Sequence, residues 1–220
     1  MMNIFRILGD FSHLLSILIL IYTIRATRVI DGISFKTQTL YAVVFITRYC
    51  DLFFRYISLY NTIMKIFFIV SSAYIVVLLQ SFHKKNPIAY KEMILADSFK
   101  IQYILAASFA LSLIFNRKFT MFEILWSFSA WLESFAILPQ LFMLSKSGKS
   151  KSLTIHYIFA LGLYRALYIP NWAWRYYQED KFDKIAILTG IIQTLIYSDF
   201  FYIYYKKVIK GARSDLPHYI

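Results

Sequence analysis

Long apolar stretches recur along the whole chain, and they restrict the fold more than any other feature. A membrane-crossing helix needs roughly 20 apolar residues. Of the 220 residues, 59% are apolar and 16% are charged, against roughly 25% charged in soluble domains. Hydropathy over windows of roughly 19 residues predicts seven spans, at Ile4–Ile24, Thr37–Phe54, Tyr60–Leu79, Phe99–Phe115, Phe119–Leu144, Thr154–Tyr176 and Asp183–Tyr205. We therefore expect an all-α membrane protein with a seven-helix transmembrane domain over residues 1–205 and a tail over 206–220.

The basic residues between the predicted spans are distributed unevenly. Thirteen Lys and Arg residues fall on one side of the membrane and five on the other. Cytosolic loops carry the excess of basic residues, so the C-terminus is predicted to be cytosolic and the N-terminus luminal or extracellular. The net charge of +12 then reflects topology and contact with membrane lipid, and no nucleic-acid partner is expected.

A short internal repeat precedes the second and sixth spans. Gly-Ile-Ser at 32–34 and Gly-Lys-Ser at 148–150 are each followed by a threonine, Thr37 or Thr154, and eleven residues later by an arginine, Arg48 or Arg165. Both segments run in the same direction across the predicted membrane. This pattern predicts two parallel three-helix repeats joined by the fourth span, an architecture used by one class of transporters.

Ionisable and aromatic side chains form stripes inside four of the spans. Charged groups within a membrane are costly and usually functional, and residues three, four or seven apart share one helix face. We expect the stripes to face one another around a cavity at the luminal side, and they comprise Arg6, Asp10 and His13; Arg48 and Asp51; Glu123, Trp126 and Glu133; and Arg165, Tyr168, Trp172 and Arg175.

Two interpretations of these stripes are open. The charges either pair with one another, as buried charges must, or bind a ligand, and for the deep pair Arg165 and Glu133 both are equally tenable. Arginine forks suit carboxylates, so the luminal set favours an acidic peptide that ends in a free carboxylate. Trp126 and Trp172 either stack on a ligand cation or pack within the bundle.

A titratable residue and a basic tail complete the candidate features. His13 lies well inside a span, and histidine changes charge near neutral pH, so binding of carboxylates should strengthen in acid unless the ring is held by Asp10 or a backbone carbonyl. Asp199 is a charge in the seventh span without an evident structural need. The three lysines after that span either anchor the topology or are read by a sorting protein: Lys206, Lys207 and Lys210.

Signs of catalysis or of a cofactor are not found in the sequence. There is no phosphate-binding loop, no metal-ligand cluster and no Ser-His-Asp arrangement, and Cys50 is the single cysteine. We expect a protein that is not an enzyme and that uses no cofactor or metal.

Several segments together resemble the KDEL/HDEL receptor family, the endoplasmic-reticulum protein-retention receptors. These segments are distributed over nearly the whole chain. In chain order they are NIFRILGD (3–10) with SHL (12–14), ITRY (46–49), ISLYN (57–61), WLES (131–134) through PQL (139–141), LYRALY (163–168) through the Asn-Trp and Trp-Arg-Tyr that follow, and YSDFFY (197–202). The resemblance implies a seven-helix fold similar to SWEET and PQ-loop transporters.

The resemblance also implies recognition of a C-terminal Lys/His-Asp-Glu-Leu signal. In such a site Arg48 would hold the terminal carboxylate, Arg6 the glutamate and Arg175 the aspartate of the signal. Asp51 and Glu123 would face the cation at the first position of the signal, and Trp126 would stack on it. Tyr168 and Trp172 would line the pocket. Arg55 departs from the family pattern and puts the first-position preference in doubt.

Regulation and sorting are implied in the same way. His13 would sense pH, with Tyr164, Glu133 and Arg165 as the network that tightens on protonation. Lys207 and Lys210 would be read by the COPI coat, and Asp199 would be needed for transport.

The function expected on this basis is pH-dependent retrieval of escaped luminal proteins from the Golgi to the endoplasmic reticulum, with the protein resident in both membranes. The alternative is a proton-coupled small-solute transporter of the SWEET or PQ-loop type.

Overall fold

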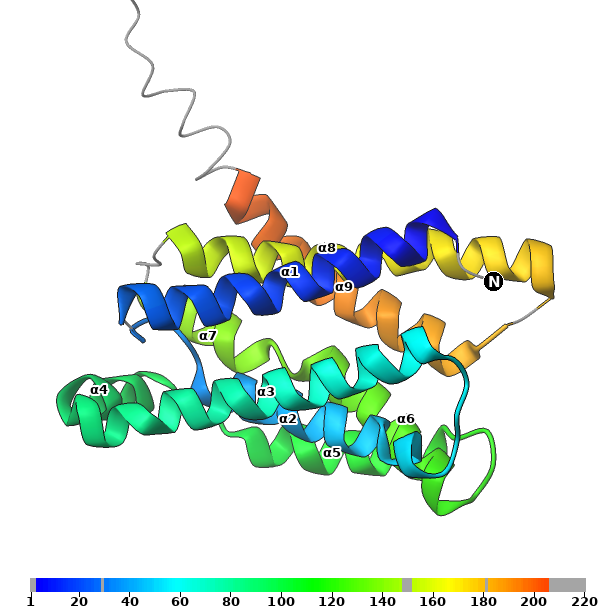
Figure 1. Cartoon of the computed structure of the whole chain (residues 1–220), viewed down its shortest axis with the longest axis horizontal. Coiled ribbons are helices and arrows are strands. Elements are labelled where there is room, and N and C mark those ends of the chain that lie inside the picture. Colours follow the sequence, from blue (N-terminus) through cyan, green and yellow to red (C-terminus); the bar gives the residue numbers. More distant parts are fainter. Residues whose placement is uncertain (1–2, 29, 148–151, 181, 206–220) are drawn as a thin grey trace, which may run out of the picture.

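The computed structural model describes residues 3–28, 30–147, 152–180 and 182–205, and within these ranges the regular structure is helical. Figure 1 shows most helices running along one long axis, with α4 at one end of the bundle. In chain order the elements are α1 (Ile4–Thr27), α2 (Phe35–Arg48), the 3₁₀ helix η1 (Cys50–Phe53), α3 (Leu59–Lys85), α4 (Pro87–Ala96), α5 (Ile101–Ile114), α6 (Met121–Phe135), α7 (Leu138–Ser147), α8 (Ser152–Glu179) and α9 (Lys184–Tyr204).

Side-chain caps determine where many of these helices begin. The first backbone N–H groups of a helix lack partners within it, and short polar side chains supply the missing acceptors. Ser34 Oγ accepts from Thr37 N at 3.0 Å. The other capping residues are Asn3 for α1, Ser58 for α3, Asn86 for α4 and Asp183 for α9. The sequence itself therefore encodes most helix starts.

Among the residues that the structure describes, length and hydropathy identify four helices or continuous helix pairs that are able to cross a membrane. A fifth span is added if α4 and α5, which are bent by 55° at their junction, act as one. This confirms the prediction of an all-α membrane protein. The four are Ile4–Thr27, Leu59–Lys85, Met121–Ser145 and Lys184–Tyr202.

Three predicted spans differ from the helices observed. The second span was expected to continue to Phe54, but α2 ends at Arg48 and a 3₁₀ turn follows. The fourth is preceded by the separate helix α4, which ends where Asp97 leaves helical geometry (φ −83°, ψ 63°). The fifth is divided between Phe135 and Leu138. Pro139 explains this last break, because proline lacks an N–H and clashes with the carbonyl four residues earlier.

Two polar residues, one at the end of α4 and one at the start of α7, form hydrogen bonds with the segment where α2 begins. The buried Asp97 Oδ2 accepts hydrogen bonds from Ser34 Oγ and Lys36 N, each at 2.8 Å. Gln140, also fully buried, accepts from Ser34 N at 2.9 Å and donates to Gly32 O at 2.8 Å. These bonds explain why polar side chains are stable at the junctions of broken helices.

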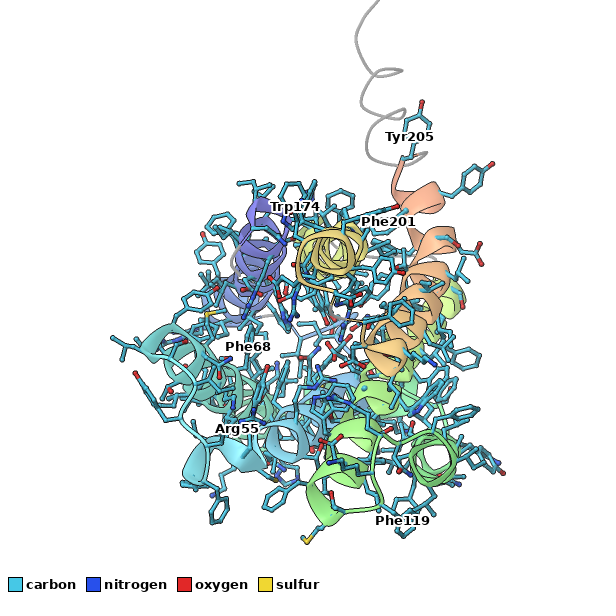
Figure 2. The ribbon with its side chains drawn as sticks, turned by 90° about the vertical axis from the view of Figure 1, so that its right-hand side faces the viewer. Arg55, Phe68, Phe119, Trp174, Phe201 and Tyr205 are labelled. Carbon is cyan, nitrogen blue, oxygen red and sulfur yellow. The ribbon has the colours of Figure 1, made fainter. Side chains whose placement is uncertain are left out.

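The helices pack into a bundle with an apolar outer surface. α1 packs along α8, α2 packs against α3 and α6, and α9 packs against α6 and α8. Side chains such as Phe11, Val70 and Leu195 are 59–64% exposed, as suits surfaces that contact lipid. Figure 2 views the bundle from the end that carries Arg55 and Phe119, and nitrogen and oxygen atoms gather in its centre. The bundle therefore encloses its polar groups and faces outward with apolar ones.

Candidate functional site

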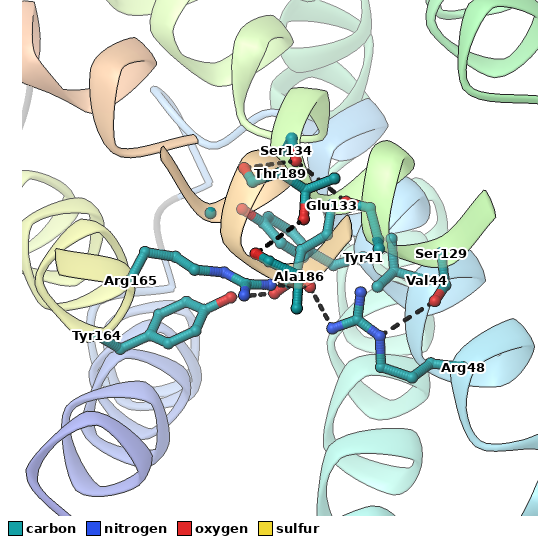
Figure 3. A network of polar contacts seen from close by, with 12 residues as sticks. Tyr41, Val44, Arg48, Ser129, Glu133, Ser134, Tyr164, Arg165, Ala186 and Thr189 are labelled. Carbon is teal, nitrogen blue, oxygen red and sulfur yellow. Dashed lines mark hydrogen bonds and ion pairs between the residues drawn. The ribbon is translucent and has the colours of Figure 1, made fainter. Parts of the chain in front are cut away.

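A buried ionic network at the centre of the bundle joins three helices. Glu133 on α6 is 1% exposed, and its Oε2 forms ion pairs with Arg48 from α2 and Arg165 from α8. Its Oε1 accepts a hydrogen bond from the Tyr164 hydroxyl. Figure 3 shows Arg165 and Tyr164 approaching Glu133 from one side and Arg48 from the other. Of the two interpretations left open for Arg165 and Glu133, the structure shows the ion pair, and Arg48 joins it.

Positive charge exceeds negative charge in this network, because one carboxylate serves two guanidinium groups. Arg48 Nε donates to Ser129 Oγ at 3.1 Å. The buried Nε of Arg165 has no hydrogen-bond partner among the described residues. Arginine forks prefer carboxylate partners, so the network retains capacity to bind a further anion.

His13 lies next to this network, within a stack of aromatic rings. Its imidazole is parallel to the Tyr164 ring, with centroids 4.1 Å apart, and it also stacks on Phe68 at 4.4 Å. His13 is only 6% exposed. Within the described part of the chain we find no hydrogen bond from the imidazole to Asp10, so the ring is positioned by stacking.

Asp10, one turn before His13, has its own partners. Asp10 Oδ2 accepts from the Tyr60 hydroxyl at 2.6 Å, and Oδ1 accepts from the Tyr168 hydroxyl. Arg6 Nε lies 3.8 Å from Oδ2. Gly9 permits this arrangement, because a Cβ at that position would lie 2.8 Å from the Tyr168 ring. α1 and α8 are thereby held close enough for their polar stripes to meet.

Lys65 on α3 is a functional candidate that the sequence analysis missed. Its Nζ lies 2.7 and 2.8 Å from the two carboxylate oxygens of Asp51, and the residue is 6% exposed. The signal was present, because Lys65 lies within a predicted span. The expectation that Arg48 and Asp51 share a helix face is wrong, since α2 ends between them and Asp51 belongs to η1.

These groups surround a cavity of about 140 Å³, here called the inner cavity. Its lining includes four basic and two acidic side chains, together with His13, Tyr60, Tyr164 and Tyr168. The charged members are Arg6, Arg48, Lys65 and Arg165, and Asp10 and Glu133. The excess of positive charge makes this cavity suited to carboxylate groups.

A second cavity of about 590 Å³, the outer cavity, lies between the loop before α6 and the facing ends of α8 and α9. Arg117, Trp172, Arg175, Asp183 and Lys184 are among its lining residues. Arg175 Nε is 3.3 Å from Glu179 Oε2, one helical turn further along α8.

A glycine on α9 makes room for Trp172 beside this cavity. A Cβ at Gly190 would lie 2.1 Å from the Trp172 ring, so any larger residue would force the indole to move. The position of Trp172 in the outer cavity therefore depends on a residue in another helix.

The predicted ligand residues are consequently distributed over two cavities and not one. The inner cavity brings together Arg6, Arg48, Arg165 and Tyr168, and the outer cavity includes Trp172 and Arg175. Glu123 and Trp126 both contact Arg117, which lines the outer cavity.

The predicted sorting residues lie elsewhere. Asp199 is exposed on α9, and Lys206, Lys207 and Lys210 fall outside the described residues. No group of three or more metal-ligating side chains occurs in the ranges that the structure describes.

Comparison with known proteins identifies the family. Residues 29–175 match the family model described as ER lumen protein retaining receptor. The chain belongs to this receptor family. It is 68% identical over 218 residues to the ER lumen protein-retaining receptor of Saccharomyces cerevisiae, covering 98% of this chain and 100% of that protein. The similarly named proteins of Kluyveromyces lactis and Drosophila melanogaster are 62% and 50% identical, over 99% and 98% of this chain and 100% of each relative.

Family membership bears on three of the sequence-based predictions. The family is one of retention receptors and not of enzymes, which confirms that the chain is not an enzyme. It also favours a receptor over the alternative of a solute transporter, and it agrees with a multi-pass protein of the endoplasmic reticulum and Golgi membranes.

Proposed function

We propose that this protein binds the C-terminal Lys/His-Asp-Glu-Leu signal of escaped luminal proteins and returns them from the Golgi to the endoplasmic reticulum. The observation that carries the proposal is the inner cavity, where four cations outnumber two carboxylates. A peptide that ends in Asp-Glu-Leu brings three carboxylates, including its terminus. Relatives named ER lumen protein-retaining receptor, which match 98–99% of the chain, support the same function.

Each carboxylate of the signal is assigned to one arginine. Arg48 receives the terminal carboxylate, Arg6 the glutamate, and Arg175 the aspartate. Arg48 and Arg6 line the inner cavity and Arg175 lines the outer one, so an extended peptide with its terminus inside and its first residue outside would meet them in this order. Tyr168 and Trp172, whose ring centroids are 5.9 Å apart, provide the wall between these contacts.

The first residue of the signal is placed beside Asp51, Glu123 and Trp126. Its cation would stack on the indole and lie near the two carboxylates. Both of these acids already have basic partners within the chain, Lys65 for Asp51 and Arg117 for Glu123. Binding of the signal would therefore exchange an internal cation for one from the cargo.

Protonation of His13 is proposed to couple binding to pH. The imidazole stacks on Tyr164, which donates to Glu133. A proton on His13 adds a positive charge beside a site that receives carboxylates, and it draws the negative charge of Glu133 toward itself, which releases Arg48 for the ligand. Binding therefore strengthens in the acidic Golgi and weakens in the near-neutral endoplasmic reticulum.

The proposed topology has seven spans in two parallel repeats. The first repeat is α1, α2 and α3, the linker is α4 with α5, and the second repeat is α6–α7, α8 and α9. Helix packing supports this assignment, because α3 packs on α1 and α2 just as α9 packs on α6–α7 and α8. Contacts between the repeats are also symmetric, with α1 on α8 and α2 on α6. Seven spans put the two ends on opposite sides of the membrane, and the excess of basic residues on one side assigns the C-terminus to the cytosol and the N-terminus to the lumen.

The C-terminal tail is proposed to be read by the COPI coat through Lys207 and Lys210, with Lys206 as a membrane-side anchor. The exposed carboxylate of Asp199 is available on α9 for a contact that transport requires. Replacing Lys207 and Lys210 with alanine should abolish retrieval in cells and leave peptide binding by the purified protein unchanged. Loss of binding by the same variant would refute the separation of these roles.

Peptide binding by the purified full-length protein tests the main proposal. A His-Asp-Glu-Leu peptide with a free C-terminus should bind more tightly at acidic than at neutral pH, and the amidated peptide should bind weakly at both. Equal affinity for the free and amidated peptides would refute the role of Arg48 as the carboxylate-binding residue.

A further inference from the structure

Arg117 occupies a cage that is built to hold a cation. Its guanidinium carbon lies 3.9 Å from the centroid of the Trp126 ring. Its Nε is 3.5 Å from Glu123 Oε2, and its Nη2 is 3.2 Å from Asp183 Oδ2. An aromatic face flanked by two carboxylates is the arrangement that recognises ammonium, imidazolium and guanidinium groups. We call Trp126, Glu123 and Asp183 the cation cage.

The cage is held together by residues from different parts of the fold. Glu123 and Trp126 are one turn apart on α6, and Asp183 caps the start of α9 by accepting from Ala186 N at 3.2 Å. Arg117 lies in the loop between α5 and α6. Two elements of secondary structure therefore form the walls, and the occupant comes from a loop.

The contacts of Arg117 are of a kind that a ligand can replace. The side chain of Arg117 is 48% exposed, and the side chains of Glu123 and Asp183 are 33% and 34% exposed. Ion pairs with this much solvent contact contribute little net free energy. Arg117 also lines the outer cavity, so a ligand that enters this cavity meets the guanidinium directly.

We propose that Arg117 is an internal competitor for the first residue of the retention signal and so determines the preference at that position. This inference rests on the proposed function, in which Glu123 and Trp126 face that residue. A cationic first residue has to displace Arg117 before it reaches the indole and the two carboxylates. An acidic first residue instead pairs with Arg117 where it stands. The protein therefore prefers lysine at the first position of the signal less strongly than it would if Arg117 were absent from the cage.

The test compares peptides that differ only in their first residue. Lys-, Ala- and Asp-Asp-Glu-Leu peptides are titrated at acidic pH against the wild-type protein and Arg117→Gln. We expect the variant to bind the Lys peptide on the order of fivefold more tightly and the Asp peptide on the order of fivefold more weakly, from the loss of one stacked and ion-paired cation. Affinity for the Ala peptide should change less than about twofold, because alanine has no charge for Arg117 to attract or repel.

Lys118→Gln is the matched control, because it removes the same charge from the adjacent exposed residue of the same loop. A general change in the electrostatic potential would affect both variants alike, whereas competition within the cage affects Arg117→Gln alone. Arg117→Lys retains a cation and should restore most of the wild-type preference.

The readout is the ratio of the Asp-peptide and Lys-peptide dissociation constants within each variant, which does not depend on the fraction of protein that is correctly folded. The same ratio in the wild-type protein and Arg117→Gln would overturn the inference while leaving the proposed function intact. If the wild-type protein bound none of the peptides, the proposed function and this inference would both be refuted.

Discussion

The His13 and Tyr164 rings lie parallel, 4.1 Å apart and inclined by 5°, so the titratable ring in the bundle lies against the phenol that donates to Glu133. A positive charge on His13 therefore acts on Tyr164 and Glu133 across a single ring contact. Low solvent exposure of both residues, 6% and 4%, keeps the interaction from being screened.

Replacing His13 with phenylalanine preserves the stack and removes the proton acceptor. The wild-type protein should gain affinity for the free-carboxyl signal on the order of tenfold between neutral and acidic pH, because protonation adds a charge opposite to that of the ligand. His13→Phe should show the same weak affinity at both values. His83→Phe, at the far end of α3, should retain the pH dependence. A rise in affinity in acid by His13→Phe would exclude His13 as the sensor.

Glu133→Gln is expected to destabilise the protein severely. It leaves Arg48 and Arg165 buried beside a neutral amide, and removing one partner of a buried ion pair costs about 3–5 kcal/mol. Tyr164→Phe removes one hydrogen bond to a charged group and should cost less, about 1–3 kcal/mol. Thermal unfolding in detergent measures both, with the exposed Glu92→Gln on α4 as the control. The reverse order of the two effects would show that Glu133 is not the centre of the network.

Asp51 and Lys65 should respond unequally to neutralisation. Asp51→Asn leaves the buried Lys65 ammonium without a counter-charge and should cost about 3 kcal/mol. Lys65→Met leaves Asp51, whose side chain is 34% exposed, so we expect a cost of about 1 kcal/mol. The double variant should be more stable than Asp51→Asn alone. Unfolding measurements on the double-mutant cycle test this, and additive effects would mean that the pair does not interact.

Gly190→Ala should displace Trp172, because the new Cβ would lie 2.1 Å from the indole. Overpacking of this kind typically costs about 1–3 kcal/mol and should also weaken signal binding at the outer cavity. Shortening the clashing side chain, in Gly190→Ala combined with Trp172→Leu, should recover stability without recovering binding. If the second substitution gives no recovery, the contact between α9 and the indole is not the cause.

Residue chemistry made part of the site predictable from sequence. A charge inside an apolar span needs a partner, so an ion pair between Arg165 and Glu133 was one of the two interpretations that their residue types and their depth in the predicted spans allowed. The same reasoning applied to Lys65 would have found its ion pair with Asp51. Helix starts were predictable where a capping side chain stands in the sequence, as at Asn3 and Asp183.

Other features depend on which segments become neighbours in space. Hydropathy averaged over a long window does not resolve the end of α2 at Arg48 or the break at Asp97. From the sequence, Arg117 was only one of the basic residues in the loops. Its contact with Asp183 was not predictable, because the two positions are 66 residues apart. The division of the predicted cavity into two follows from such long-range contacts, which spacing along one helix cannot encode.

The single carboxylate that Arg48 and Arg165 share has a consequence for the lifetime of the protein. A cargo carboxylate would add a second counter-charge beside these two guanidinium groups, and it would bind the folded chain alone. Such a ligand raises the free energy of unfolding by about 2.7 kcal/mol at a hundredfold excess over its dissociation constant. Unoccupied molecules would then unfold and be degraded sooner than occupied ones, so the number of receptors in a cell would adjust itself to the amount of cargo that escapes.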